Sequence, residues 1–150
     1  RLRILRKKGG GNDGDVDDVV QEVFLTAMKG MSAIQNPRAI RGWLKTIAVR
    51  KSFRHLRKRR VRTLLGFDRG ACYDHVAASG CGPEDKALLS RVYGLLDELP
   101  TSERLAWTLR YVEGEQVDAV ARLCGCSLAT AKRRITAAQE HIERKTNHGC

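Results

Sequence analysis

Positive charge in this chain is concentrated in one short segment. The residues from Arg38 to Arg62 include eleven Lys and Arg and no Asp or Glu. Removing these eleven from the 28 basic residues leaves 17, which equals the 17 Asp and Glu, so the whole formal charge of +11 belongs to this segment. A basic patch beside a neutral remainder is typical of a protein that binds a polyanion. Nucleic acid is the first candidate and an anionic membrane surface the second, whereas a small acidic substrate would need far fewer charges.

Two aromatic residues, Trp43 and Phe53, lie close to the densest part of this charge. Cations can follow phosphates while an aromatic ring stacks on a base, so the run Arg54 to Arg62 predicts contact with DNA opened from its duplex. Two plainer interpretations stay open. The run can be a solvated helix end, and Trp43, at helical spacing from Leu44 and Ile47, individually fits a core position better.

A cluster of carboxylates near the N-terminus is a candidate metal site. Its members are Asp13, Asp15, Asp17 and Asp18. The spacing resembles the start of a calcium-binding loop, but the position that needs Gly is Asp18 and the position that needs Glu is Phe24. Carboxylates at a helix N-terminus are the better interpretation. A metal-dependent nuclease or recombinase that uses this cluster is kept as the enzyme alternative.

The cysteines lack the spacing of a zinc site, which needs one close pair repeated by a second. They are Cys72, Cys81, Cys124, Cys126 and Cys150. Their number is odd and too small for a disulfide scaffold, so we expect thiols. No Ser/His/Asp or Cys/His pairing has support in the sequence. We therefore expect no catalytic residue, no metal, no cofactor and no enzymatic activity.

Helical periodicity dominates the patterned stretches and strand signals are weak, so we predict an all-α protein. A first helix should follow the acidic cluster, with an apolar stripe and a polar face. The stripe consists of Val19, Val20, Val23, Phe24, Ala27, Met28 and Met31, and the other face carries Asp18, Gln21, Glu22 and Leu25. The pattern breaks from Gly30 to Pro37.

A second helix should run from about Ala39 into the basic segment. Its apolar residues fall on two roughly opposite faces. One face carries Ile40, Trp43, Leu44 and Ile47, and the other carries Val49, Phe53 and Leu56. Such a helix is either buried on two sides in turn or bent near Val49.

Periodicity disappears from about Leu64 to Pro83, where several glycines separate small and polar residues. This predicts a flexible linker at residues 64–83 between two small helical domains, at residues 1–63 and 84–150. Four helices are expected after the linker. Their apolar positions are Leu88, Val92, Leu95, Leu96 and Leu99; Leu105, Leu109 and Val112; Val117, Val120 and Ala121; and Leu128, Ala131, Ile135, Ala138 and Ile142.

The last two helices have the plan of a helix-turn-helix. Gly125 lies in the turn and Ser127 is suited to cap the last helix, which has Thr and basic residues opposite its apolar stripe. Polar side chains near the start of such a helix can reach base edges in the major groove. Plain helical packing is the alternative from the pattern alone, and the basic segment favours DNA binding.

These stretches resemble a known family. The sequence DDVVQEVF at residues 17–24, followed by RGWLKTIA at residues 41–48 and the basic run, resembles region 2 of the extracytoplasmic-function sigma factors of bacterial RNA polymerase. LDELP at residues 96–100 and TAKRRI at residues 130–135 resemble region 4 of the same family. Order, spacing and linker match as well, so the resemblance covers residues 15–144.

The resemblance implies a sigma-2-like domain, a sigma-4-like helix-turn-helix domain, and a role in directing core RNA polymerase to promoters. Implied partners are core RNA polymerase, promoter DNA and an anti-sigma factor. Residues implied to bind core polymerase are Asp18, Gln21, Glu22 and Phe24. Residues implied to bind the minus-10 element are Trp43, Arg50, Lys51, Arg54, Arg57 and Lys58, and those implied to bind the minus-35 element are Thr130, Lys132, Arg133, Arg134 and Thr136.

The sequence departs from the family pattern in places. Arg50 and Arg54 stand where the family usually has Asn and Asp, which predicts stronger phosphate binding. Ala137 and Gln139 stand where the family often has Arg, which predicts weaker or altered minus-35 recognition. The first helix of the sigma-2 domain is mostly missing, residues 1–8 being at best its end, so we expect a truncated or divergent member.

The competing binding function is a helix-turn-helix regulator that acts on DNA without polymerase. It would not need the polar face of the first helix. No run of 18 apolar residues occurs, so we expect a soluble, cytoplasmic protein without membrane insertion.

Overall fold

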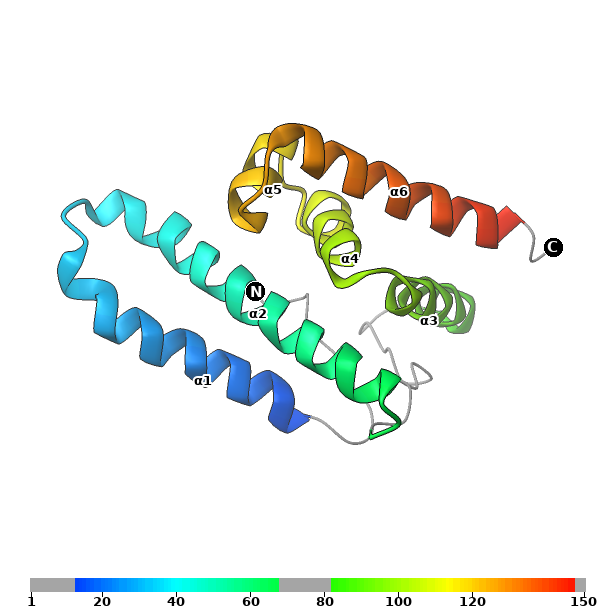
Figure 1. Cartoon of the computed structure of the whole chain (residues 1–150), viewed down its shortest axis with the longest axis horizontal. Coiled ribbons are helices and arrows are strands. Elements are labelled where there is room, and N and C mark those ends of the chain that lie inside the picture. The colour runs from blue at the N-terminus through cyan, green and yellow to red at the C-terminus, as the bar shows by residue number, and fades with distance from the viewer. Residues whose placement is uncertain (1–12, 68–81, 148–150) are drawn as a thin grey trace.

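The structure, a computed structural model, describes residues 13–67 and 82–147, and these are helical throughout apart from short turns (Figure 1). The helices are α1 (Asp13–Gly30), α2 (Ile40–Leu64), α3 (Pro83–Glu98), α4 (Thr101–Trp107), α5 (Val117–Cys124) and α6 (Leu128–Asn147). The prediction of an all-α fold is confirmed. Most of the expected linker, residues 68–81, lies outside the described residues.

α1 and α2 form a hairpin and lie side by side (Figure 1). Val19, Val23 and Ala27 are buried on α1. At the end of α1, a Cβ on Gly30 would lie 2.7 Å from the Trp43 ring. Gly30 therefore leaves room for the indole.

Two 3-10 turns connect this pair, Met31–Ala33 and Pro37–Ala39. The Asn36 side chain accepts a hydrogen bond from the Arg38 backbone N–H at 2.9 Å, and Pro37 takes the first helical position. The predicted break between Gly30 and Pro37 is confirmed.

Some apolar residues of the predicted helical stripes are exposed to solvent in the structure. Phe24, Met28 and Met31 are exposed on the first helix, and Leu88 and Leu128 are exposed at the starts of α3 and α6. Each lies at the edge of its stripe or near a helix end, where no described element covers it.

The second half contains a core between α3 and α6, made of Leu95, Leu96, Leu99, Ala138 and Ile142. α4 continues through a π-helical turn, Thr108–Val112. This segment begins and ends where the sequence predicts, after Pro100 and before Gly114.

The predicted helix-turn-helix is present as α5, a turn and α6. Gly125 adopts a left-handed conformation with φ of 62°, which glycine tolerates best. The Ser127 hydroxyl accepts a hydrogen bond from the Thr130 backbone N–H at 3.2 Å, so Ser127 caps α6 as expected.

The two halves pack directly against each other through α2. Val49 is 3% exposed and belongs to one hydrophobic cluster with Leu105, Leu109 and Val120 of the second half, and Phe53 packs on the same cluster. α2 is one continuous helix. Of the two sequence alternatives, burial on two sides is favoured by the packing of Val49 and Phe53 on the second half and of Trp43 against Gly30.

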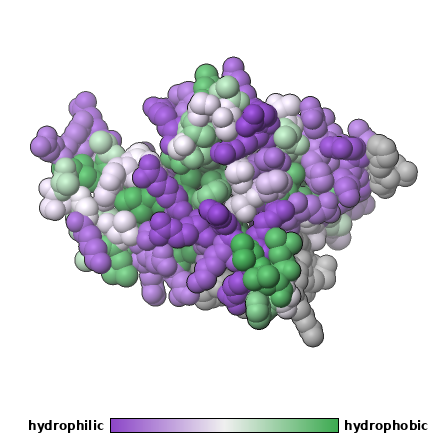
Figure 2. Space-filling view, viewed as in Figure 1, coloured by the Kyte–Doolittle hydropathy of each residue, from purple (hydrophilic) through white to green (hydrophobic). Residues whose placement is uncertain are grey.

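Figure 2 shows apolar side chains gathered where α2 ends. The exposed apolar residues at this end are Val61, Leu64, Leu65 and Phe67. They directly follow the basic run, so the helix passes from a charged surface to an apolar one before the expected linker begins.

Candidate nucleic-acid interface

The polar face of α1 is open to solvent. Asp18, Gln21 and Glu22 are all exposed, and Phe24 is 59% exposed beside them. The structure therefore brings together the four residues that the resemblance implies for polymerase binding. A solvent-facing aromatic ring next to carboxylates is a surface that suits a partner with apolar and basic groups.

The basic face of α2 carries three guanidinium groups that share one pocket. Arg50, Arg54 and Arg57 are exposed and line a cavity of about 320 Å³ together with Val49 and Phe53. None of the residues that line this pocket is acidic. Because the three positive charges lack a carboxylate among their pocket neighbours, phosphate groups would be attracted here.

Two residues implied for minus-10 binding are engaged elsewhere. The Lys51 ammonium is 3.3 Å from a Glu22 carboxylate oxygen across the hairpin. The Trp43 ring lies against Gly30 and is half-buried. The structure thus favours the core interpretation of Trp43 that the sequence left open. Lys58 is exposed.

The start of α6 presents a polar face to solvent. Lys132, Arg133 and Thr136 are exposed, at spacings that place them on one side of the helix. Arg134 is half-buried, and the Thr130 hydroxyl accepts a hydrogen bond from the Ser127 hydroxyl at 2.9 Å. Of the five residues implied for the minus-35 element, three are therefore free to face DNA and Thr130 takes part in the cap.

Sequence reasoning missed the polar residues that join the two halves. Lys45 on α2 forms an ion pair with Glu115, which follows the π-helical turn. Arg60 on α2 donates a hydrogen bond to the Leu99 carbonyl oxygen, at the end of α3. These partners are 70 and 39 residues apart in sequence, and no local sequence pattern predicts contacts at such separations.

Arg104 lines a pocket with Arg60 and Leu99. Its guanidinium pairs with Asp97 and its side chain is 16% exposed. Burial, followed by the positive charge of Arg59, lowers the pKa of Arg104 from its ordinary value to about 10. Tyr93 acts in the opposite direction and Arg60 adds to the lowering.

Cys124 lines the pocket between α2 and the second half, beside Phe53. Burial, followed by the neighbouring Cys126, raises the pKa of the Cys124 thiol to about 11, and Arg134 opposes the rise. The group is therefore a neutral thiol at physiological pH and a poor nucleophile. Both cysteines are free thiols, while Cys72, Cys81 and Cys150 lie outside the described residues.

Among the described side chains, no three His, Cys, Asp or Glu come together as metal ligands. Asp13 and Asp15, two members of the acidic cluster considered as a metal site, fall outside the described side chains. None of the helices in the described ranges has the length and apolar character required to span a membrane.

Family comparison matches both halves of the chain. The model of Sigma-70 region 2 matches residues 1–62, which include α1 and nearly all of α2. The model of Sigma-70, region 4 matches residues 89–142, which include the helix-turn-helix. The basic pocket and the exposed face of α6 thus fall in different matched regions.

Individual relatives match over most of their length. The chain is 30% identical over 141 residues to the ECF RNA polymerase sigma factor EcfG of Rhodopseudomonas palustris, covering 94% of this chain and 76% of the relative. It is 28% identical over 145 residues to the ECF RNA polymerase sigma-E factor of Escherichia coli, covering 88% and 74%. A crystal structure of the sigma factor RpoE in complex with the anti-sigma factor NepR from Bartonella quintana has the same fold. Its TM-score is 0.70 at 22% identity, over 99% of this chain and 89% of that one.

Proposed function

Because this chain belongs to the extracytoplasmic-function sigma factors of bacterial RNA polymerase, we propose that α1, α2 and α6 divide its work among three surfaces. As a sigma factor it is a transcription initiation factor that directs core RNA polymerase to specific promoters. The polymerase supplies the chemistry, and this chain acts by binding.

The first proposed surface is the exposed polar face of α1, which binds core polymerase. Asp18, Gln21 and Glu22 would supply charge and hydrogen-bond acceptors, and the exposed Phe24 an apolar contact. This surface distinguishes a sigma factor from a helix-turn-helix regulator that acts without polymerase, because such a regulator needs no polymerase-binding face.

The second proposed surface is the pocket formed by Arg50, Arg54 and Arg57 on α2, which holds the opened minus-10 strand. The proposal is supported by the three exposed guanidinium groups, because no carboxylate lines the pocket that they share. Lys58 would extend this surface along the strand. Trp43 and Lys51 are given lesser roles, because the first packs on Gly30 and the second pairs with Glu22.

The third proposed surface is the start of α6, which reads the minus-35 element in the major groove. Lys132, Arg133 and Thr136 are exposed along the side of α6 that faces away from the core. Thr130 and Arg134 flank this side, and the bond of Thr130 to Ser127 fixes the start of the helix.

We place the two functional domains at residues 1–63 and 84–150, joined by a linker at residues 64–83. The protein acts in the cytoplasm, where the polymerase is, and has no catalytic activity of its own. Exposed polymerase- and DNA-binding faces offer an anti-sigma factor two ways to inhibit it, since covering either one blocks initiation.

Run-off transcription with core polymerase tests this proposal. Reversing two charges on α1, with Asp18→Lys and Glu22→Lys, should abolish binding to core polymerase and with it the run-off product. A matched control reverses Glu140→Lys, an exposed acid on α6, and should keep polymerase binding. Unchanged polymerase binding by the α1 variant would instead favour a regulator that acts on DNA alone.

A further inference from the structure

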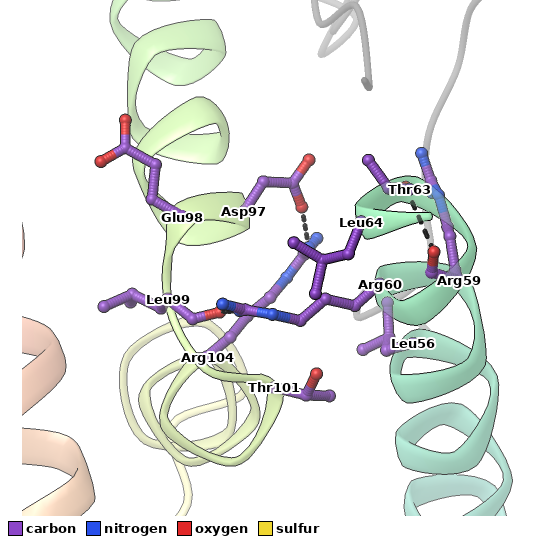
Figure 3. Close-up of a pocket in the computed structure, with 10 residues that line it drawn as sticks. All are labelled: Leu56, Arg59, Arg60, Thr63, Leu64, Asp97, Glu98, Leu99, Thr101 and Arg104. Carbon is purple, nitrogen blue, oxygen red and sulfur yellow. Dashed lines mark hydrogen bonds and ion pairs between the residues drawn. The ribbon is translucent and has the colours of Figure 1, made fainter. Parts of the chain in front are cut away.

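A pocket of about 420 Å³ lies where the end of α2 meets the connection between α3 and α4 (Figure 3). Its volume is within the range that pockets for small molecules usually have. None of the residues that line it belongs to the three surfaces proposed above. Three arginines and three leucines give the pocket its chemical character. They are Arg59, Arg60 and Arg104, and Leu56, Leu64 and Leu99.

The two carboxylates of the pocket are already engaged. Asp97 pairs with the Arg104 guanidinium. Glu98 Oε2 lies 3.1 Å from His141 Nε2 and 3.5 Å from Lys145 Nζ, both on α6. Figure 3 shows the Glu98 carboxylate directed away from the arginines of the pocket. One carboxylate is therefore left to balance three guanidinium groups.

Two of these guanidinium groups lack a carboxylate partner among the described residues. Arg60 donates a hydrogen bond to the Leu99 carbonyl oxygen, which is uncharged. Arg59 forms no ion pair with any residue in the ranges 13–67 and 82–147. The pKa of Arg104 reflects this excess of positive charge. Burial lowers it most, and Arg59 and Arg60 lower it further, against the opposing effect of Tyr93. An anion in the pocket would relieve the repulsion.

Apolar side chains form the rest of the wall. Leu56 and Leu99 are buried, whereas Leu64 is 75% exposed. Figure 3 shows Leu64 between α2 and the connection from α3 to α4, beside Arg60. Guanidinium groups bind phosphate through paired hydrogen bonds, and an exposed leucine gains free energy when an organic group covers it. The pocket therefore suits a molecule that carries phosphate groups beside an apolar or aromatic part.

We propose that this pocket binds a nucleotide, with the phosphate groups at the three arginines and the base against Leu64. A DNA strand is less suited, because the pocket has the size of a single ligand site, while grooves that bind a strand follow its backbone over several nucleotides. The nucleotide site is additional to the promoter-binding surfaces proposed above and does not depend on them.

Isothermal titration calorimetry of the full chain tests the proposal with three probes. ADP carries both parts of the expected ligand, pyrophosphate only the phosphates, and adenosine only the base and sugar. We expect ADP to bind with a stoichiometry of one. Adenosine should bind roughly ten-fold more weakly, because it cannot form the charge-assisted hydrogen bonds to the arginines. Pyrophosphate should bind about three- to five-fold more weakly than ADP, because it leaves Leu64 uncovered.

Arg59 is the best position for a charge variant, because its guanidinium is not needed for an internal ion pair. Arg59→Gln should weaken ADP binding roughly ten-fold. Arg57→Gln is the matched control, since it removes the same charge from an exposed position of the same helix that does not line this pocket. It should leave the affinity for ADP nearly unchanged. Circular dichroism verifies that each variant keeps its helices.

Leu64 tests the apolar part of the site. Leu64→Gln should weaken ADP binding about three- to five-fold and leave pyrophosphate binding unchanged, because only the base would contact this side chain. Leu65→Gln is its control, at a neighbouring leucine that is 65% exposed and does not line the pocket. It should change neither affinity. An unchanged affinity for ADP in Leu64→Gln would contradict the placement of the base and with it the nucleotide proposal.

ADP that fails to bind at roughly millimolar concentration overturns the proposal outright. Equal weakening by Arg59→Gln and Arg57→Gln also overturns it, because it indicates diffuse attraction to the basic helix. The same holds if a single-stranded oligonucleotide without a terminal phosphate displaces ADP from the wild type and loses affinity in Arg59→Gln, since the pocket would then belong to the DNA-binding surface. The proposed function is measured separately by run-off transcription, so failure of one can be told from failure of the other.

Discussion

Glu22 of α1 and Lys51 of α2 form an ion pair across the hairpin, with 3.3 Å between a carboxylate oxygen and the ammonium nitrogen. The acid belongs to the proposed polymerase surface and the base to the segment implied for DNA binding. Lys51 is the less exposed partner, with 22% of its side chain exposed against 59% for Glu22. The pair therefore holds Lys51 toward α1 and away from the basic pocket.

The salt dependence of promoter binding should distinguish Lys51 from the pocket arginines. Each phosphate contact contributes about 0.7 to 0.9 to the slope of log affinity against log salt concentration. Arg54→Gln should lower the slope of holoenzyme binding by about that amount, while Lys51→Gln should leave it nearly unchanged. Fluorescence anisotropy over a salt series measures both slopes. Equal losses in the two variants would show that Lys51 also contacts DNA.

The sequence predicts the helices well because each carries its own signals, such as Ser127 for the start of α6 and Gly125 for the turn before it. It predicts the exposed faces of α1 and α6 for the same reason. The features that the sequence does not predict depend on contacts between residues that are distant in the chain. The two apolar faces of α2 are visible in the sequence, but only the partner of Val49 in the second half decides between double burial and a bend.

Among the site residues, some positions also follow from local spacing and others depend on contacts with a neighbouring helix. Arg50, Arg54 and Arg57 share a pocket because their spacing places them together on one helix. The roles of Trp43 and Lys51 depend instead on their neighbours on α1. The Lys45–Glu115 pair has no sequence signal at all, because its members are distant in the chain and both have ordinary surface chemistry.

Ser52 supplies a prediction about stability. Its side chain is fully buried on α2, and its hydroxyl has no hydrogen-bond partner within residues 13–67 and 82–147. Because an unpartnered buried hydroxyl is destabilising, Ser52→Ala should raise the free energy of unfolding by about 1 kcal/mol. Urea denaturation measures the change, and Ser32→Ala, at an exposed serine, should have little effect. A loss of stability in Ser52→Ala would mean that the hydroxyl has a partner.

Two glycines of the hairpin should respond to alanine in opposite directions. A Cβ at Gly30 would lie 2.7 Å from the Trp43 ring, so Gly30→Ala should lower the free energy of unfolding by about 1–3 kcal/mol. A Cβ at Gly42, inside α2, would meet nothing within 4 Å. Gly42→Ala should therefore stabilise the protein by about 0.5–1 kcal/mol through helix propensity. Thermal unfolding followed by circular dichroism compares them, and a neutral Gly30→Ala would show that the indole can move aside.

Cys124 should report whether the two halves are packed together. Its pKa is raised from 9.0 to about 11, mainly by burial, so the thiolate fraction near pH 8 falls about 100-fold and alkylation slows accordingly. The rate should climb as pH rises toward 11, because deprotonation limits the reaction. Separation of α2 from the second half removes much of that burial, so binding to core polymerase should accelerate alkylation at pH 8.

Iodoacetamide labelling with peptide mass spectrometry measures Cys124 separately from the other cysteines. The protein unfolded in urea gives the reference rate of an accessible thiol. The Lys45→Glu variant should label faster than the wild type without polymerase, since its halves repel each other at Glu115. If Cys124 in the free wild-type protein reacts at the unfolded rate, it is not covered by α2, and the packed state does not dominate in solution.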